Sequence, residues 1–413
     1  MFYLKIAAAT LGALALWVAL VLWTALSGWW RESLAPTGDT EAFRRAAVAH
    51  MDTNPGNAAL VLIEDGKVIA EHYNGLDPVN GDTVFATASL GKWLTAWGVM
   101  VLVQDGSVDL DRPVDDYLTR WHLPGTGFDN QGVTVRRLLS HTAGLTDGLG
   151  WGDYQPDETV PSLVESLNDP RASSGSTVQI AVGREPGSAW DYSGGSYLIL
   201  ELLVEDVSGQ PFAEFMRQRV FAPLGMTRSG YDYLGDLDNS AGSYDRSGRP
   251  ATIYRYASKA ATALNTSAAD LTTFALAQLP GYPGQRPLTQ DIIDAMRAPH
   301  ASSMGADVWG LGTILYAPTD RGDFVFGHDG GNDPAINATT RVNPDTGDAL
   351  VALSTGSYAA SEIGSHWVSW QTGELDVFSV GREVERVVPV TLGGGIVILV
   401  GAAVVMWRRR RRQ

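Results

Sequence analysis

The sequence predicts an α/β domain of the α+β type, in which a central antiparallel sheet is built from both ends of the domain and flanked by helices. Strand-like runs occur near the start, at 57–75, and return at 311–354, whereas helical patterns and long loops fill the region between them. A hairpin at 57–75 would lack enough partners to be stable alone, so two sequential domains are disfavoured. We therefore expect one sheet with a mainly helical region inserted in the middle, and a transmembrane helix on either side of this domain.

The elements follow in order along the chain. Asp65-Gly66 joins the two strands of the first hairpin, because this dipeptide tolerates the positive φ of a tight turn. Residues 89–104 have helical periodicity. Two successive helices are expected at 196–209 and 211–225, the second with Pro211 near its first turn. Further strands are expected at 311–318, 323–328, 335–342 and 348–354, followed by a closing helix at 359–373.

Apolar runs stand near both ends, at 6–30 and 387–407. Each is long enough to cross a hydrocarbon core about 30 Å thick as a helix of ~20 residues. Arginines follow the second run directly, at 408–412, and a basic cluster next to a span marks its cytoplasmic side. The competing interpretation is a nucleic-acid-binding tail, which the position of the arginines against a span disfavours. Lys5, before the first run, favours a cytoplasmic N-terminus.

These runs divide the chain into three parts. Residues 1–30 are expected to form an N-terminal transmembrane anchor, or a signal peptide if the small residues at 25–28 are a cleavage site. Residues 31–386 form the main domain. Residues 387–413 form a C-terminal transmembrane helix with a basic cytoplasmic tail. With both termini inside the cell, the main domain lies on the extracellular or periplasmic side of the membrane.

The composition excludes several kinds of function. The net charge is −16, and all 46 acidic residues lie between the apolar runs, which argues against nucleic acid and anionic lipid surfaces as partners. The chain has no cysteine, which excludes disulfides, thiol catalysis and thiolate metal sites. The histidines stand singly without metal-ligand spacing, and no Walker, dinucleotide-binding or G-x-S-x-G pattern occurs. We expect neither a metal nor a cofactor.

Ser89 and Lys92 stand three residues apart where the helical pattern at 89–104 begins. This spacing places both side chains on one face of a helix. A serine hydroxyl is a poor nucleophile until another group takes its proton. A partly buried lysine is pushed toward its neutral form and can accept that proton, while the helix N-terminus offers free N–H groups to an oxyanion. On these four residues alone, an N-capping serine followed by a solvent-facing lysine remains an alternative.

Four stretches occur in a specific order, at 85–118, 138–145, 186–226 and 327–331. Together they resemble the serine β-lactamase and penicillin-binding-protein superfamily. The resemblance is to its branch of class C β-lactamases, D-alanyl-D-alanine peptidases and related esterases. It covers most of 40–375 and implies the fold class predicted above.

The resemblance implies a set of catalytic residues. Ser89 matches the nucleophile and Lys92 its lysine, and Tyr192 begins the family's Tyr-x-Asn motif, here Tyr-Ser-Gly. A tyrosine acts as a general base only if nearby cations favour its phenolate. Lys92 and a protonated His328 are the candidate cations. We expect His141, in the stretch 138–145, to be structural.

The third motif of the family, Lys-Thr-Gly or His-x-Gly at a strand edge, falls on His328-Asp329-Gly330. By this resemblance, the backbone N–H groups of Ser89 and Gly331 form the oxyanion hole. Gly194, Asp329 and Gly330 then contact the substrate. Glycine at 330–331 also suits a backbone that must approach the substrate closely.

Two departures from the family pattern bear on the substrate. Gly194 replaces the asparagine that holds the substrate amide in β-lactamases, and His328 replaces the lysine that favours its carboxylate. Efficient hydrolysis of β-lactams is therefore not expected, and an esterase-like or peptidase-like activity is favoured.

The sequence thus predicts a membrane-anchored, extracytoplasmic serine hydrolase that acts through an acyl-enzyme on a small-molecule, ester or peptide substrate. Its other expected partner is the lipid bilayer that holds the two spans. The alternative is a catalytically weak or inactive binding protein on the same fold, which senses cell-wall or lipid ligands. Ser89, Lys92 and Tyr192 favour the enzyme, while Gly194 keeps the alternative open.

Overall fold

The structure is a computed structural model and describes residues 2–26, 33–148, 153–172, 178–332 and 335–411, with the backbone alone at 2 and 379–386. At its centre lies one sheet of eight strands in the order β2-β1-β12-β11-β10-β9-β8-β7, paired antiparallel throughout. The strands are β1 (Ala58–Glu64), β2 (Lys67–Asn74), β7 (Ala301–Ser303), β8 (Ala306–Trp309), β9 (Ile314–Pro318), β10 (Phe324–Asn332), β11 (Ile336–Asn343) and β12 (Asp348–Ser354).

The first hairpin joins strands from the other end of the domain. β1 pairs with β12, with Ala58 opposite Ser354. The turn between β1 and β2 has positive φ at both Asp65 (48°) and Gly66 (69°), as expected from the dipeptide. The expectation that both ends of the domain build one sheet is therefore confirmed.

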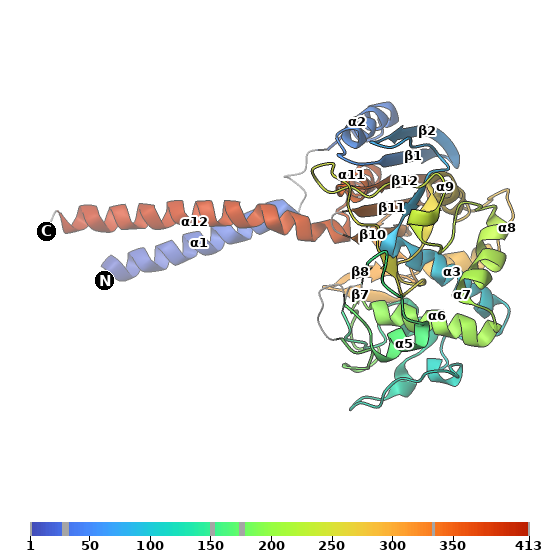
Figure 1. The fold of residues 1–413 in the computed structure, drawn as a ribbon. Helices are drawn as coiled ribbons and strands as arrows, with labels where there is room; N and C mark the ends of the chain where they lie inside the picture. The colour runs from blue at the N-terminus through green and yellow to red at the C-terminus, as the bar shows by residue number, and fades with distance from the viewer. Residues whose placement is uncertain (1, 27–32, 149–152, 173–177, 333–334, 412–413) are drawn as a thin grey trace.

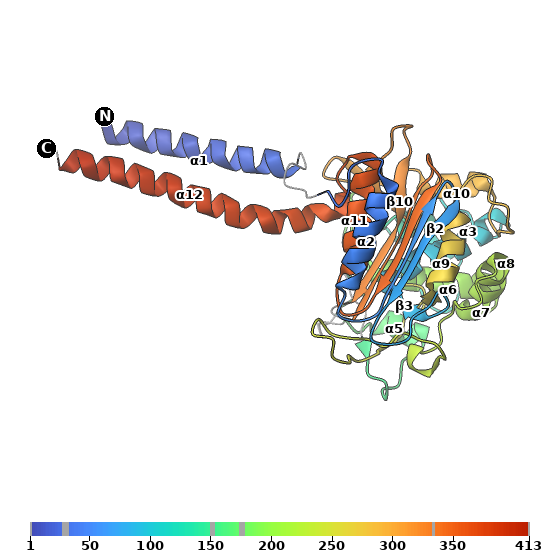
Figure 2. The ribbon, with the colours of Figure 1, turned by 90° about the horizontal axis from the view of Figure 1, so that it is seen from above.

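Helices cover both faces of this sheet (Figure 2). On one face, α2 (Thr40–Asp52) and α11 (Ala359–Thr372) form a hydrophobic cluster with alternate residues of β1, Leu60 and Leu62. On the other face, α3 (Gly91–Gln104) and α9 (Ala268–Leu276) pack against Val61 and Ile63. The alternation follows from the two-residue period of a strand, which sends successive side chains to opposite faces.

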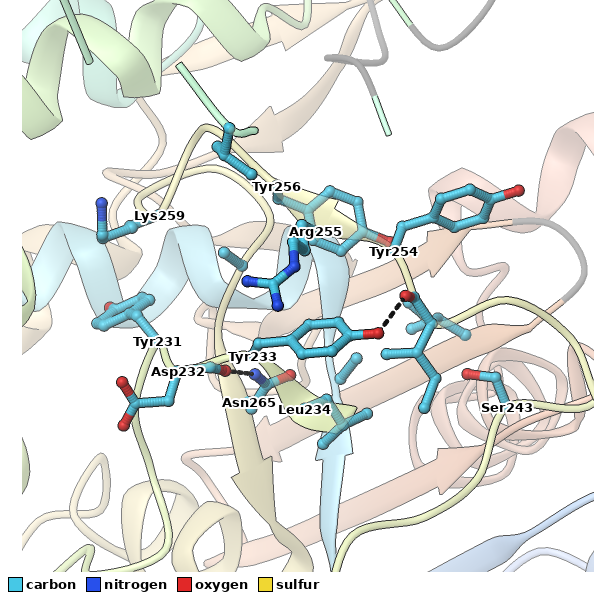
Figure 3. Close-up of a pocket in the computed structure, with 15 residues that line it drawn as sticks. Tyr231, Asp232, Tyr233, Leu234, Ser243, Tyr254, Arg255, Tyr256, Lys259 and Asn265 are labelled. Atoms are coloured by element: carbon cyan, nitrogen blue, oxygen red, sulfur yellow. Dashed lines mark hydrogen bonds between the residues drawn. The ribbon is translucent and has the colours of Figure 1, made fainter. Parts of the chain in front are cut away.

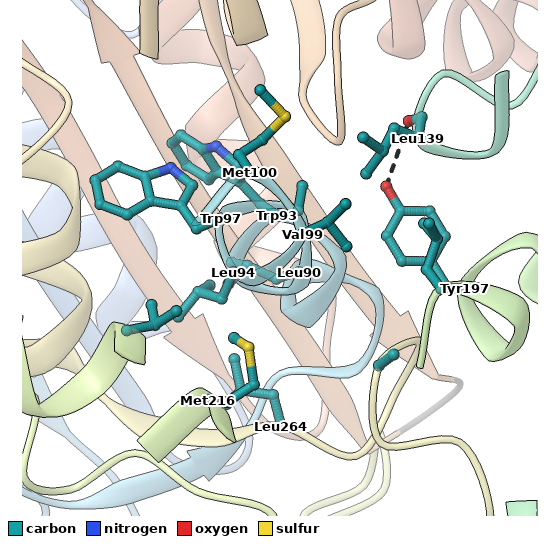
Figure 4. Packing of buried hydrophobic residues seen from close by; sticks show 14 of the residues in the cluster. Leu90, Trp93, Leu94, Trp97, Val99, Met100, Leu139, Tyr197, Met216 and Leu264 are labelled. Carbon is teal, nitrogen blue, oxygen red and sulfur yellow. Dashed lines mark hydrogen bonds between the residues drawn. The ribbon is translucent and has the colours of Figure 1, made fainter. Parts of the chain in front are cut away.

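The inserted helical region surrounds α3. Figure 4 shows the side chains of Trp93, Leu94 and Trp97 radiating from this helix, and all three are fully buried. A helix without a polar face is a central core helix. The helices around it are α4 (Val135–Leu139), α5 (Leu163–Asn168), α6 (Gly194–Ser208), α7 (Phe212–Met216), α8 (Ala222–Leu224) and α10 (Gln290–Arg297).

Two expected helices differ in detail. The helix expected at 89–104 begins with a 3₁₀ turn, η1 (Ala88–Leu90), and α3 proper starts at Gly91. The single helix expected at 211–225 is divided into α7, a π-helical segment at Arg217–Phe221, and α8. Helix α8 has a proline in its first turn, and that residue has no N–H to continue the hydrogen-bond ladder.

Helices α1 (Phe2–Leu26) and α12 (Val380–Arg410) extend from the domain side by side (Figures 1 and 2). Trp17 Nε1 donates a hydrogen bond to the carbonyl of Thr391 at 3.2 Å, which ties the two helices together. Their segments Tyr3–Ala25 and Val387–Arg410 are long and apolar enough to cross a membrane. α12 begins seven residues before the second of these segments.

Candidate active site

Ser89 stands where a strand turns into the central helix. β3 (Val84–Ala86) pairs with β6 (Asn265–Ser267) and leads into η1. Thr87 fixes the end of this strand, because its N–H and its hydroxyl both donate to the Leu264 carbonyl, at 3.0 and 2.9 Å. The next residue, Ala88, has a φ of 45°, in the left-handed region that side chains rarely adopt. This sharp turn leaves Ser89 half-buried at the start of α3.

Lys92 lies one helical turn from Ser89 and is only 2% exposed. Its Nζ donates hydrogen bonds to Ser89 Oγ at 3.0 Å and to the Ala261 carbonyl at 2.8 Å. Burial lowers the pKa of Lys92 to about 7, although the charge of Asp147 acts in the opposite direction. The solvent-facing lysine considered above is thus excluded. Near neutral pH a large share of Lys92 is an amine, within reach of the Ser89 proton.

Tyr192 lies directly before α6, and the centroid of its ring is 5.1 Å from Lys92 Nζ. The ring packs against His141 at 4.3 Å and Trp309 at 5.5 Å between centroids. Burial raises the pKa of Tyr192 far above its usual range, against the lesser effect of a hydrogen bond with Ser89. Tyr192 is therefore a neutral phenol next to the nucleophile, suited to donate a proton or a hydrogen bond.

His328 is buried on β10. Its Nδ1 lies 2.6 Å from the Asp329 carbonyl, and because a carbonyl only accepts, Nδ1 carries the proton. Burial and the charge of Lys92 lower the pKa of His328 to about 3. A protonated His328 therefore does not favour a Tyr192 phenolate at neutral pH, which corrects that expectation. Lys92 remains as the candidate base.

The two glycines at 330–331 play different steric roles. At Gly330, a Cβ would lie 1.8 Å from the Thr87 carbonyl oxygen, so only glycine lets β10 run this close to η1. At Gly331, a Cβ would find its nearest atom at 3.7 Å, an ordinary contact. The expectation of a steric need for glycine holds for Gly330 and not for Gly331. Gly330 brings the end of β10, and with it the Gly331 backbone, alongside Ser89.

The side chain of Asp329 points to the opposite face of the sheet from His328. Arg341 Nη2 donates to Asp329 Oδ2 at 2.9 Å, and the Tyr316 hydroxyl donates to Asp329 Oδ1 at 2.9 Å. Asp329 was expected to contact the substrate, and with its side chain turned away only its backbone can do so. Alternation along β10 causes this, since His328 and Asp329 are neighbours on one strand.

Gly194 is the first residue of α6 and has no side chain to offer a substrate amide. Its neighbours are held by Asp147, which sequence reasoning did not find. The Ser193 hydroxyl donates to Asp147 Oδ1 at 2.5 Å, and the Gly195 N–H donates to Oδ2 at 3.1 Å. Burial raises the pKa of Asp147 to about 6. The only signal in the sequence was its place soon after the stretch 138–145.

His141 lies buried beside Tyr192, and its structural role stays a prediction. Its Nδ1 accepts a hydrogen bond from the Ser193 N–H at 3.1 Å, and its ring stacks on Tyr192. Burial lowers the pKa of His141 far below its usual range. His141 therefore orients the Tyr192 motif as a neutral imidazole.

Glu201 is a second buried carboxyl that the sequence did not reveal. It lies on α6, is fully buried, and its Oε2 accepts from the Ala260 N–H at 3.0 Å. Burial raises its pKa to about 7, while Lys259 opposes the shift. The next residue in that loop, Ala261, supplies the carbonyl to which Lys92 is bound. Glu201 thus holds the loop whose next residue binds Lys92.

Two hollows lie near the elements around Ser89, one against β3 and the other against the end of β10, and Ser89 itself lines neither. One, of about 220 Å³, is lined by four tyrosines from the segments 231–233 and 254–256 (Figure 3). The other, of about 610 Å³, is lined by Gly330, Gly331, Tyr358 and Phe378, among others. Among the described residues no cluster of histidine, aspartate and glutamate is suited to hold a metal ion. The tyrosines of the first hollow are Tyr231, Tyr233, Tyr254 and Tyr256.

Part of the chain is similar in sequence to a penicillin-binding protein and to an esterase. The chain is 32% identical over 179 residues to penicillin-binding protein 4* of Bacillus subtilis (strain 168), covering 42% of this chain and 37% of that protein. It is 28% identical over 200 residues to esterase EstB of Burkholderia gladioli, covering 42% of this chain and 46% of that protein. The chain thus spans less than half the length of either relative.

The fold is shared with the octameric penicillin-binding protein homologue from Pyrococcus abyssi, with a TM-score of 0.65 and 21% identity over 84% of this chain and 80% of that one. The family described as Beta-lactamase matches residues 43–370, which include both strand-bearing ends of the sheet and the whole helical insertion. By this match the chain belongs to the β-lactamase family of serine hydrolases and penicillin-binding proteins.

Proposed function

We propose that the chain is a membrane-anchored serine hydrolase that works outside the cytoplasm, through an acyl-enzyme, on an ester or amide. The observation that carries this proposal is the 3.0 Å contact between Ser89 Oγ and Lys92 Nζ, in which the buried lysine has a pKa of about 7. A lysine in that state is matched to general-base catalysis near neutral pH.

In the acylation step the Lys92 amine takes the proton of Ser89 Oγ, and Oγ attacks the substrate carbonyl carbon. The N–H groups of Ser89 and Gly331 donate to the oxyanion that develops. The tetrahedral intermediate collapses as the bond to the leaving group breaks. The leaving group takes a proton from the Lys92 ammonium, directly or through the Tyr192 hydroxyl. Water then attacks the ester on Ser89 by the same steps, which releases the acid and restores the serine.

The surroundings of Ser89 favour an ester over a β-lactam. Gly194 has no amide group to hold a substrate amide, and His328 is a neutral imidazole where a lysine would favour a carboxylate. An unmatched polar group on a bound substrate typically costs ~1–3 kcal/mol, and more if it is charged. A small ester with a good leaving group needs only the nucleophile, the base and the oxyanion hole.

The membrane location is supported by the two long apolar helices α1 and α12 and by the arginines that follow Trp407. Basic residues next to a span favour its cytoplasmic side, which leaves the domain between the helices on the other side. Protease treatment of intact cells tests this location, because it should degrade the domain and spare the arginine-rich tail.

The activity is tested by comparing hydrolysis of p-nitrophenyl butyrate and of a cephalosporin by the full-length protein. We expect ester turnover that Ser89→Ala abolishes, and slow or absent cephalosporin turnover. Cephalosporin turnover equal to ester turnover would contradict the substrate argument. Covalent labelling of Ser89 without any ester turnover would instead favour the binding protein.

A further inference from the structure

The larger hollow lies between the end of β10 and the turn that precedes the C-terminal helix. It has a volume of about 610 Å³ and includes Gly330 and Gly331, the backbone that runs beside Ser89. Its other walls include Tyr358 at the start of α11 and Phe378, both of them 37% exposed. Ser361 and Asn337 add polar groups, so the hollow, which we call the membrane-side cleft, suits a polar rather than a purely aliphatic occupant.

Phe378 fixes the start of the C-terminal helix to the active site. It lies in a 3₁₀ turn, η6 (Val377–Ser379), directly before α12. Its ring centroid is 6.2 Å from that of Trp309 and 6.0 Å from that of Trp190. Trp309 in turn packs on Tyr192 and His328, at 5.5 and 5.4 Å. The same aromatic cluster therefore contacts both the catalytic residues and the base of the C-terminal helix.

The distance from this cleft to the membrane follows from helix geometry. α12 is continuous from Val380, and its apolar segment begins at Val387. Seven residues at a rise of 1.5 Å each span about 10 Å. The headgroup layer of one leaflet is about 5–7 Å thick. The cleft thus lies just beyond the headgroups, on the side of the domain from which α1 and α12 extend (Figure 1).

We propose that the membrane-side cleft receives the polar part of a lipid-tethered acyl donor, an ester or amide carried on the headgroup of an amphiphile in the same bilayer. This inference rests on the function proposed above and adds the class of its substrate. The polar lining of the cleft matches a headgroup or linker, and its glycine wall delivers the carbonyl to Ser89. Holding enzyme and substrate in one membrane raises the effective concentration of the substrate.

The test uses the full chain in phosphatidylcholine vesicles and two fluorogenic esters with the same reacting group. One ester is water-soluble, and the other is joined to a diacyl lipid through ethylene glycol linkers of increasing length. We expect the lipid-tethered ester to be hydrolysed faster once the linker spans about 10 Å. Shorter linkers should fail, because the carbonyl cannot reach Ser89.

A matched pair of insertions tests whether the height of the cleft above the membrane matters. Seven helix-forming residues inserted between 386 and 387 raise the cleft by about 10 Å, and the same seven residues inserted after 410 leave it in place. The first insertion should lower hydrolysis of the short-linker ester by at least ~10-fold, with recovery on longer linkers. Hydrolysis of the water-soluble ester should be unchanged in both.

Equal effects of the two insertions, or no dependence on linker length, would overturn the inference while leaving the hydrolase intact. If no version hydrolyses even the water-soluble ester, the proposed function fails, and this inference fails with it.

Discussion

Two cations are buried on opposite faces of the same sheet, and they differ in their partners. Lys92 is 2% exposed on the α3 side, and Arg341 is fully buried on the α11 side. Lys92 donates to two neutral oxygens, whereas Arg341 pairs with the carboxylates of Asp329 and Asp376, at 2.9 and 2.5 Å. Both cations lose their hydration on burial, and only Arg341 has carboxylate partners that compensate this loss.

The consequence is opposite protonation behaviour. Burial lowers the pKa of Lys92 to about 7. The pKa of Arg341 is raised, because Asp329 and Asp376 outweigh the effect of burial. Burial alone therefore does not make a catalytic group. A buried cation becomes a proton acceptor where no carboxylate holds its charge, and a permanent structural charge where two do.

The largest expected effect comes from removing the amine of Lys92. Lys92→Ala should lower the rate of Ser89 acylation by ~10²–10⁴-fold, the usual contribution of a positioned general base. Lys92→Arg should not restore it, because a guanidinium stays protonated. The rates are measured by fluorophosphonate labelling of folded protein. A Lys92→Arg variant as fast as wild type would show that the charge, and not the proton transfer, is what Ser89 needs.

The second expected effect is on stability. Arg341→Leu leaves the buried Asp376 and the partly exposed Asp329 without their cation. Breaking a buried pair in this way typically costs ~3–5 kcal/mol of unfolding free energy. Arg249→Ala is the matched control, since this arginine is 78% exposed beside Asp245 and should change stability by less than ~1 kcal/mol. Denaturant unfolding measures both. Equal losses in the two variants would contradict the contrast between the faces.

Local signals in the sequence predicted the parts of the site that depend on spacing. The i, i+3 relation of Ser89 and Lys92 and the turn at Asp65-Gly66 are short-range, and the structure has both as expected. Which face of the sheet the Asp329 side chain occupies depends on the register of β10 against its neighbouring strands, and this pairing is not a local signal. The π-helical segment at Arg217–Phe221 was not predicted either, although the proline in the first turn of α8 follows it closely.

Asp147 and Glu201 could not be predicted for a related reason. Each acts through partners distant in sequence: Asp147 through Ser193, and Glu201 through Ala260. A single carboxylate gives no periodicity or motif from which its burial can be read. The strands β7 and β8 were also missed, since they are short and lie between the expected helical region and the strands expected from 311.

Asp147 offers a finer test of how Lys92 is tuned. Ester hydrolysis should rise with pH through about 7 as Lys92 loses its proton. The charge of Asp147 raises the pKa of Lys92, so Asp147→Asn should move the inflection of kcat/KM to lower pH. A loss of rate at every pH with a fixed inflection would mean that Asp147 only holds Ser193 and Gly195 in place.

The smallest expected effect concerns Glu201, the carboxyl behind the loop that binds Lys92. Burial raises its pKa from 4.5 to about 7, so the neutral form is the one that the fold favours. The stability that this group contributes is present below pH 4.5 and is lost as the pH rises through about 7. Glu201→Gln keeps an acceptor for the Ala260 N–H and removes the titration. The variant should therefore become more stable than wild type across this window, by a few kcal/mol at most.

Glu214→Gln is the control: its exposed carboxylate has a lowered pKa through Arg217, so its contribution is lost only as the pH falls below the usual range. Unfolding measured from pH 4 to 8 separates the two, and a Glu201→Gln curve parallel to wild type would mean that Glu201 stays ionised through its contact with Lys259.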